Sequence, residues 1–340
     1  MTAPPTTGPV ADDFLRLADP YRRELLAHCY RMLGSVHDAE DLVQETYLRA
    51  WRGYDRFEGR SSLRTWLHKI ATTACLTALE SRKRRPMPTG LGGPTDDPTG
   101  ELAAQPEIPW LEPVPDTLAG MDESDPANVV TGRETVRLAL IAALQHLPPR
   151  QRAVLILRDV LRWQASEVAS SLDMTTAAVN SALQRAHAQL DKVSPKPDEV
   201  AEPTESRGRE LLARWVSVFQ DYNFNGIVDL VTQDVVWEMP PFPEWVVGPE
   251  PVRQLITAQC PAHGPGDLLL VPTTANGGQP AFATYLLDPE TGVHRAFQFQ
   301  VLTLTPAGVS QVAIFFDTTL FAAFGFPMTA NPVDTVVSED

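Results

Sequence analysis

LPPRQRAVLILRDVLRWQASEVASSLDMTTAAVNSALQRAHAQL occupies residues 147–190. Its apolar residues recur at helical spacing in three runs, and Asp173-Met174 separates the last two runs. Thr175 stands directly before the last run, where a helix N-cap is expected. Two short helices joined by a tight turn are typical of a helix-turn-helix, whose second helix enters the DNA major groove. A helical hairpin without a DNA role is the alternative for this segment taken alone.

The outer face of the last predicted helix carries small polar groups, two amides and a guanidinium. Such groups suit contacts with base edges and phosphates. We therefore expect the following residues to face DNA: Thr176, Asn180, Ser181, Gln184 and Arg185.

A second helical segment, DAEDLVQETYLRAW, spans residues 38–51. One side of it is apolar at helical spacing, and the other side combines acidic and amide groups with one leucine. A mixed acidic and apolar strip suits docking onto a basic partner helix, whereas a solvated acidic face is the alternative. The residues of this strip are Asp41, Gln44, Glu45 and Leu48.

Aromatic residues lie among arginines over residues 54–62, directly before a further helical stripe that begins at Leu63. Stacking platforms beside cationic groups are what single-stranded DNA binding requires. In the alternative interpretation, Trp66 is a core residue and the basic run over 82–85 is a solvated helix end. The candidate DNA contacts here are Phe57, Arg60, Ser61, Arg64, Trp66 and Lys69.

The net charge of −15 is unevenly distributed along the chain. Residues 13–85 carry 14 Lys and Arg against 10 Asp and Glu, and residues 134–194 carry 7 against 5. Residues 86–133 carry 1 against 9, and residues 195–340 carry 6 against 18. Both candidate DNA segments are therefore mildly basic. An excess this small neutralises few phosphates, so we expect tight DNA binding to need a partner.

The composition is that of a soluble globular chain of several domains. No apolar run reaches the roughly 18 residues of a membrane span, and the first residues lack the features of a signal peptide. Three dispersed cysteines indicate free thiols in the cytoplasm. We expect seven segments: a tail over 1–12, a helical domain over 13–85, an acidic Pro-rich linker over 86–130, a helix-turn-helix domain over 131–194, a linker over 195–206, a third domain over 207–330 and a tail over 331–340.

The third domain opens with an amphipathic helix from residue 209 and continues with strand-like segments. The predicted strands cover residues 235–239, 268–274, 281–287, 293–305 and 309–316, with a hairpin turn over 288–292. A helix followed by a long meander favours an α+β domain with a curved sheet.

The three helical segments together resemble the extracytoplasmic-function sigma factors, which are specificity subunits of bacterial RNA polymerase. The resemblance covers residues 14–192 except the linker. It implies that residues 38–51 bind the β′ clamp helices of the polymerase core, that residues 57–79 melt the promoter and read its −10 element, and that residues 147–186 read its −35 element. It also implies that the linker follows the polymerase channel toward the active site.

Residues 207–330 resemble the SnoaL-like branch of the NTF2-like fold, an α+β cone fused to a subgroup of these sigma factors. Such a cone can enclose a small molecule. The candidate pocket residues are Trp215, Trp237, Glu238, His263 and Asp317.

The expected fold is thus multidomain, with two all-α sigma domains and a C-terminal α+β cone. The expected partners are the RNA polymerase core, promoter DNA and a small-molecule ligand, without a membrane. We expect no cofactor, no metal and no catalytic residue, and we expect the third domain to regulate the sigma domains in cis. Two alternatives remain: a one-component helix-turn-helix regulator with a metabolite-binding domain, and a SnoaL-type cyclase or isomerase.

Overall fold

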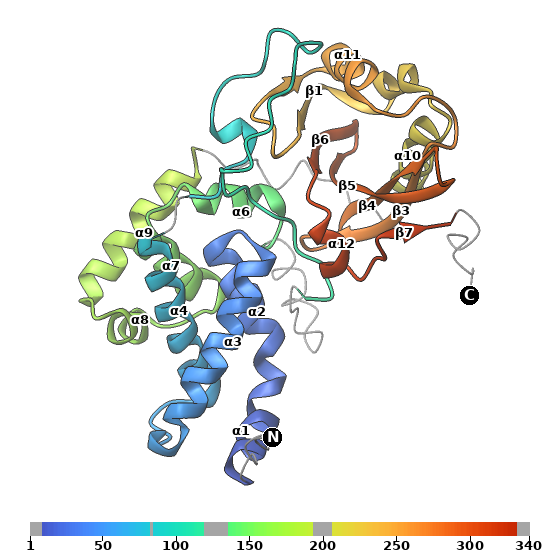
Figure 1. Cartoon of the computed structure of the whole chain (residues 1–340). Helices are drawn as coiled ribbons and strands as arrows, with labels where there is room; N and C mark the ends of the chain where they lie inside the picture. The colour runs from blue at the N-terminus through green and yellow to red at the C-terminus, as the bar shows by residue number, and fades with distance from the viewer. Residues whose placement is uncertain (1–8, 82–83, 119–134, 193–205, 332–340) are drawn as a thin grey trace. The chain divides into compact units, whose positions relative to one another are not determined.

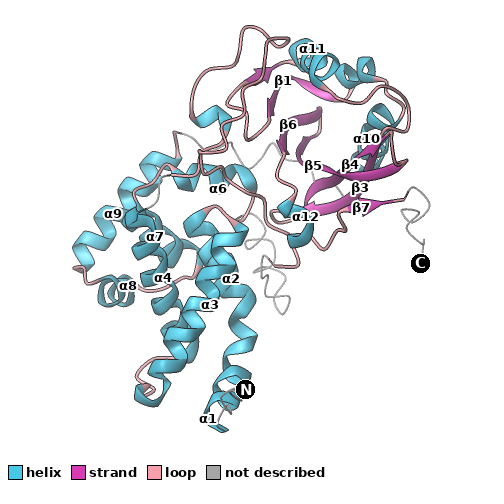
Figure 2. Ribbon diagram, in the orientation of Figure 1, coloured by secondary structure: helices cyan, strands magenta, loops and turns pink. Residues whose placement is uncertain are grey.

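The structure is a computed structural model that describes residues 9–81, 84–118, 135–192 and 206–331. The chain divides into two compact units (Figures 1 and 2). The helical unit comprises Met1–Arg84 and Asp116–Ser194, and the sheet unit comprises Arg85–Pro115 and Pro195–Asp340. The predicted fold class, helical domains followed by an α+β domain, is confirmed.

The helical unit contains two groups of helices, α1–α4 and α6–α9. The described helices are α1 (Pro9–Ala18), α2 (Arg22–Leu33), α3 (Val36–Gly53), α4 (Leu63–Ser81), α6 (Leu138–Gln145), α7 (Pro149–Leu155), α8 (Ala165–Leu172) and α9 (Thr176–Leu190). A π-helical turn, Ile156–Val160, follows α7. Helix α2 is buried over nearly its whole length because α3, α4, α6 and α7 all pack against it.

The predicted helix-turn-helix is confirmed in α8 and α9. Asp173 ends α8 in the left-handed conformation, with φ of +52°. The Thr175 hydroxyl caps α9 by accepting a hydrogen bond from the Ala178 N–H at 3.1 Å. Val168 and Val179 are fully buried between the two helices and their support, so the outer face of α9 is left to solvent.

Arg152 of α7 joins the two groups of helices. It is only 3% exposed, and its guanidinium donates to the carbonyl oxygen of Met32 in α2 and to Gln145 Oε1 at 2.7 Å. It also donates to the carbonyl oxygens of Gln145 and Leu147, both at 3.2 Å. Burial lowers the pKa of Arg152 to about 10, so the side chain still carries its charge at neutral pH.

The sheet unit is built on one seven-stranded sheet in the order β2-β1-β6-β5-β4-β3, with β7 paired to β5. Strand β1 runs parallel to β6, and the other pairs are antiparallel. The elements are α10 (Ser206–Gln220), β1 (Val231–Glu238), β2 (Trp245–Val247), α11 (Pro249–Gln259), β3 (Leu268–Ala275), β4 (Gln279–Asp288), β5 (Val293–Thr305), β6 (Gly308–Phe315), α12 (Thr319–Ala323) and β7 (Thr329–Ala330). The five predicted strands are confirmed as β1 and β3–β6.

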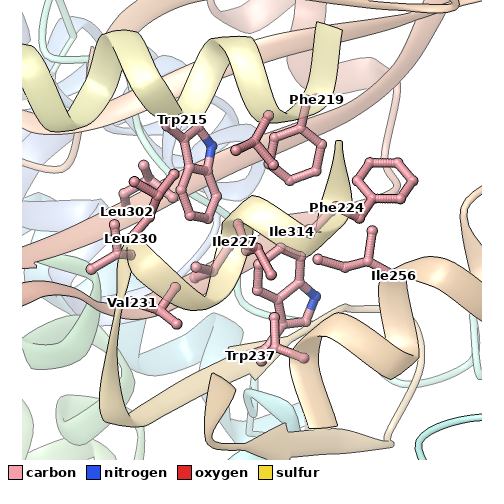
Figure 3. Packing of buried hydrophobic residues seen from close by; sticks show 14 of the residues in the cluster. Trp215, Phe219, Phe224, Ile227, Leu230, Val231, Trp237, Ile256, Leu302 and Ile314 are labelled. Atoms are coloured by element: carbon pink, nitrogen blue, oxygen red, sulfur yellow. The ribbon is translucent and has the colours of Figure 1, made fainter. Parts of the chain in front are cut away.

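One apolar core fills the space between the sheet and helices α10 and α11. Figure 3 shows two tryptophans in this core, Trp215 from α10 and Trp237 from β1. Their ring centroids are 6.0 Å apart, and both side chains are at most 1% exposed. Trp215 Nε1 donates to Gln300 Oε1 at 3.0 Å, so the polar edge of this indole is satisfied inside the core.

The segment Arg85–Pro115, which we call the strap, belongs to the sheet unit. The Thr95 N–H donates to the Trp245 carbonyl at 2.8 Å, and the Gln105 N–H donates to the Pro241 carbonyl at 2.9 Å. Sequence analysis predicted an acidic Pro-rich linker over 86–130, and the strap indeed has no α-helix or long strand, only short turns at Pro88–Gly90, 97–100 and 105–108. The difference is that the backbone groups of the strap find partners on the sheet unit.

Asn276 fixes the far end of the strap. Its N–H donates to the Val114 carbonyl at 2.9 Å, and its Oδ1 accepts from the Val114 N–H at 3.1 Å. Asn276 has φ of +51° and is fully buried. Asparagine tolerates this left-handed conformation better than most residues do, and here it satisfies both backbone groups of Val114.

Glu238 lies beneath the near end of the strap and is fully buried. Its Oε2 accepts from the Thr89 N–H at 2.9 Å, and its Oε1 accepts from Gln311 Nε2 at 2.8 Å. Burial raises the pKa of the Glu238 carboxyl, and the hydrogen bonds from Thr89 and Gln311 oppose this shift.

None of the helices in the described ranges is long and apolar enough to cross a membrane. Over the same ranges, no group of three or more His, Cys, Asp or Glu side chains is arranged to hold a metal ion.

We predict that Glu238→Gln flattens the pH dependence of sheet-unit stability. Because the carboxyl pKa is raised in the folded chain, the folded state holds the proton more tightly than the unfolded chain does. This contribution to the free energy of unfolding is fully present below the unfolded pKa and is lost as the pH rises through the folded pKa. Urea titrations between about pH 4 and about pH 8 measure it, with the exposed Glu290→Gln as control. Equal pH slopes for native protein and E238Q would show the prediction to be wrong.

We also predict that Arg152→Met destabilises the helical unit by about 3–5 kcal/mol, because it leaves the carbonyl oxygens around the buried guanidinium without donors. Thermal unfolding followed by circular dichroism measures the loss. The matched control is Arg150→Met, which replaces an exposed arginine of the same helix and should change stability by less than about 0.5 kcal/mol.

Candidate nucleic-acid interface

The outer face of α3 presents the strip expected to dock on a partner. Asp41 and Gln44 are exposed, Leu48 is 47% exposed, and Glu45 is half-buried with an ion pair to Arg49. Sequence analysis missed Trp51, which follows Leu48 by three residues and is 49% exposed. Large exposed apolar groups beside carboxylates provide the mixed surface that a basic amphipathic helix can cover.

Aromatic side chains gather where α3 ends and α4 begins. The Phe57 and Trp66 ring centroids are 4.8 Å apart, and Phe57 stacks on Tyr54 with 13° between the planes. Phe14 of α1 also packs against the cluster, with its ring centroid 5.1 Å from that of Tyr54. Tyr54, Phe57 and Trp66 are each half-buried, so the cluster is part core and part surface.

Polar and basic residues surround this cluster. Ser61 and Lys69 are exposed, and Arg60 is highly exposed with an ion pair to Glu58 at 2.9 Å. An ion pair this exposed contributes little to stability, so its arginine can exchange the carboxylate for a phosphate at small cost. Ser62 caps α4 by accepting from the Thr65 N–H at 3.1 Å.

Arg64 is held more firmly than Arg60. Its guanidinium binds both carboxylate oxygens of Glu24, with Nε at 2.9 and 2.8 Å. His68, one turn along α4, lies 3.7 Å from the same carboxylate and is 1% exposed. Glu24 of α2 therefore fixes the orientation of the Arg64 guanidinium and partly neutralises its charge.

Two buried histidines and one threonine hold α4 against α2. The Thr72 hydroxyl donates to the His68 carbonyl at 2.7 Å and therefore accepts from His28 Nε2 at 2.9 Å. Burial lowers the pKa of both histidines, which favours neutral rings. The apolar stripe of α4 gives no sign of this contact, because His68 and Thr72 lie between its apolar positions.

The expected DNA face of α9 is open to solvent. All five of its residues are exposed: Thr176, Asn180, Ser181, Gln184 and Arg185. His187, next to this face, is hydrogen-bonded instead to Asp159, with 2.6 Å between Nε2 and Oδ2. The face thus offers hydroxyl, amide and guanidinium groups from one rigid, capped helix.

The sheet unit contains a cavity of about 450 Å³. Its walls are largely apolar and come from α10, α11 and the inner face of the sheet, and Glu101 and Leu102 of the strap complete the lining. The apolar wall includes Phe219, Trp237, Met239, Leu255, Phe297 and Ile314.

Of the five residues predicted to line a pocket, Trp237 lines this cavity and four lie elsewhere. Trp215 packs in the core against Trp237 and Phe219, and Glu238 points to the strap from the next position of β1. His263 is exposed in a turn closed by Asp267. Asp317 is exposed and caps α12 through Thr319. These four therefore do not line this cavity: Trp215 faces the core from α10, strand alternation turns Glu238 away, and His263 and Asp317 lie in loops.

Two family models match the helical unit. Sigma-70 region 2 matches residues 17–85, and Sigma-70 region 4 matches residues 137–190. The first match contains α2, α3, α4 and the aromatic cluster, and the second contains the helix-turn-helix.

The chain is 54% identical over 316 residues to the ECF RNA polymerase sigma factor SigG of Mycobacterium tuberculosis, covering 93% of this chain and 84% of that protein. It is 28% identical over 252 residues to SigJ of the same organism, covering 72% of each chain. The crystal structure of SigJ has the same fold, with a TM-score of 0.59 and 22% identity over 92% of this chain and 99% of that one.

These matches span both DNA-binding segments and the C-terminal domain, so neither the one-component regulator nor the cyclase is favoured. The chain belongs to the extracytoplasmic-function family of RNA polymerase sigma factors.

Proposed function

We propose that the exposed faces of the helical unit carry the sigma activity as follows. The face of α9 enters the major groove at the −35 element, where Gln184 and Arg185 are long enough to reach base edges. The single observation that best supports this assignment is that all five expected residues are exposed on a helix whose opposite side is buried.

The loop before α4, residues 57–62, binds the −10 element. Extracting a base from the stack costs a few kcal/mol, and a preformed aromatic surface offsets part of that cost. The half-buried rings of Phe57 and Trp66 supply stacking surface, while Arg60, Arg64 and Lys69 lie where a displaced strand brings phosphates. The buried His28, Thr72 and His68 contact keeps α4 in register with α2 during melting.

The strip on α3 binds the clamp helices of the polymerase core. Leu48 and Trp51 supply the apolar contact, and Asp41 and Glu45 supply charge opposite to a basic helix. Binding to the core provides the DNA affinity that the small basic excess of the helical unit cannot provide alone.

The sheet unit regulates this activity in cis and takes a small-molecule ligand in its cavity. In the family, the linker follows the polymerase channel; here, backbone hydrogen bonds hold the strap on the sheet unit. The strap cannot occupy both places at once. Release of the strap is therefore required for initiation, and the docked state is the inactive one.

We predict that Arg185→Ala costs about 1–3 kcal/mol of discrimination at one base pair of the −35 element, because a bidentate base contact is lost. Run-off transcription with core polymerase on promoters altered singly through the −35 element measures this preference. The matched control is Arg150→Ala, an exposed arginine outside the α9 face. An unchanged −35 preference in R185A would remove Arg185 from the reading surface.

We predict that loosening the strap raises transcription in the full-length chain. Gln105→Pro removes the N–H that donates to Pro241, whereas Ala103→Pro places proline at an exposed residue of the same segment. Q105P should initiate more than both A103P and the native protein in run-off transcription. A chain ending at Ser194 lacks the docking surface altogether and should behave like Q105P. Equal transcription from the full and shortened chains would refute regulation in cis.

A further inference from the structure

One residue of the largely apolar cavity wall, Trp237, carries an unsatisfied donor. Trp237 is 1% exposed, and its Nε1 has no hydrogen-bond partner among the described residues. A buried N–H left without an acceptor carries a free-energy cost. A molecule that brings an acceptor to this N–H recovers that cost, so the site favours a ligand with a carbonyl or ether oxygen over a pure hydrocarbon.

The charge around the cavity selects against anions. Glu101 is the only acidic side chain among the described lining residues, and no lysine or arginine lines the cavity. The polar groups otherwise present are the amides of Gln259 and Gln298 and the thiol of Cys260. Burial raises the pKa of the Cys260 thiol, so it is mostly uncharged at neutral pH.

The strap forms part of the cavity wall, and this links occupancy to strap docking. Gln259 lines the cavity, and its Nε2 donates to the carbonyl oxygens of Gly100 at 2.7 Å and Thr99 at 3.4 Å. These contacts hold the strap directly before Glu101 and Leu102, which themselves line the cavity. Leu102 is half-buried against the core of the sheet unit.

From these observations we infer that the cavity binds an uncharged, mostly apolar small molecule with a carbonyl-type acceptor, which Trp237 Nε1 hydrogen-bonds and Leu102 of the strap covers. The volume of about 450 Å³ falls in the range that holds drug-sized ligands. A molecule that contacts Leu102 binds more tightly when the strap is docked, so by reciprocity it holds the strap in place. The ligand is thus a co-inhibitor of initiation, an assignment that rests on the proposed regulation in cis.

The test uses 6-propionyl-2-(dimethylamino)naphthalene, an uncharged naphthyl ketone whose fluorescence shifts to the blue in an apolar site. Titrated into the full-length chain, it should show saturable binding at one site. Trp237→Phe keeps an aromatic side chain but replaces the indole with a smaller ring that has no N–H, and should weaken binding about five-fold. Trp51→Phe, at an exposed tryptophan of the helical unit, should leave binding unchanged. The matched naphthoate, with a carboxylate in place of the ketone, should bind at least about ten-fold more weakly.

Two further measurements locate the probe and test the coupling. Bound ketone should slow alkylation of Cys260 by iodoacetamide, while the buried Cys29 and Cys75 of the helical unit serve as internal references. It should also slow hydrogen exchange of strap peptides that contain the Thr95 and Gln105 amides. Leu102→Ser should weaken ketone binding and abolish the slowed exchange.

Three outcomes would overturn the inference: no saturable binding, equal affinity in native protein and W237F, or binding that leaves Cys260 alkylation unchanged. Binding without slower exchange in the strap would overturn the co-inhibitor role. These measurements contain neither polymerase nor DNA, so their failure leaves the transcription test of the strap untouched. Conversely, equal transcription by the full and shortened chains would refute regulation in cis whatever the cavity binds.

Discussion

The docking of the strap on the sheet unit is the constraint on which the organisation of this chain depends. The prolines exclude a regular helix over most of the strap, and a backbone outside regular secondary structure must find other hydrogen-bond partners for its N–H and C=O groups. Here they pair with Trp245, Pro241 and Asn276. The segment that follows the first promoter-reading group of helices therefore packs on a third domain, the sheet unit. No long helix or strand is needed for this, only donors and acceptors at matching positions along the sheet unit.

The same docking explains why polar groups are buried beneath the strap. Burying the Glu238 carboxyl without hydrogen-bond partners would cost free energy. Here Thr89 donates to one of its oxygens and Gln311 donates to the other. Gln259 plays the corresponding part beside the cavity, where it donates to strap carbonyls. Apolar residues of the strap are buried as well, among them Leu111 and Val114, so specific hydrogen bonds and apolar burial together hold the strap.

In the helical unit, helix periodicity separates the surface from the core, because α3 and α9 each bury one face and expose the opposite face. Buried Arg152 and the His28, Thr72 and His68 contact fix how the helices meet, and the outer faces of α3 and α9 remain exposed.

Sequence alone was sufficient for the helices, the turn of the helix-turn-helix, the strand order along the chain and the family, because periodicity and capping are local properties. It also placed the exposed faces of α3 and α9, since one apolar stripe determines the opposite side. It placed only Trp237 of the five candidate pocket residues on the wall of the described cavity, and it did not anticipate the strap, Trp51 or the buried histidines. A pocket wall depends on which way strand alternation turns each side chain. Docking of the strap depends on backbone groups of residues more than a hundred positions apart, which only the tertiary structure brings together.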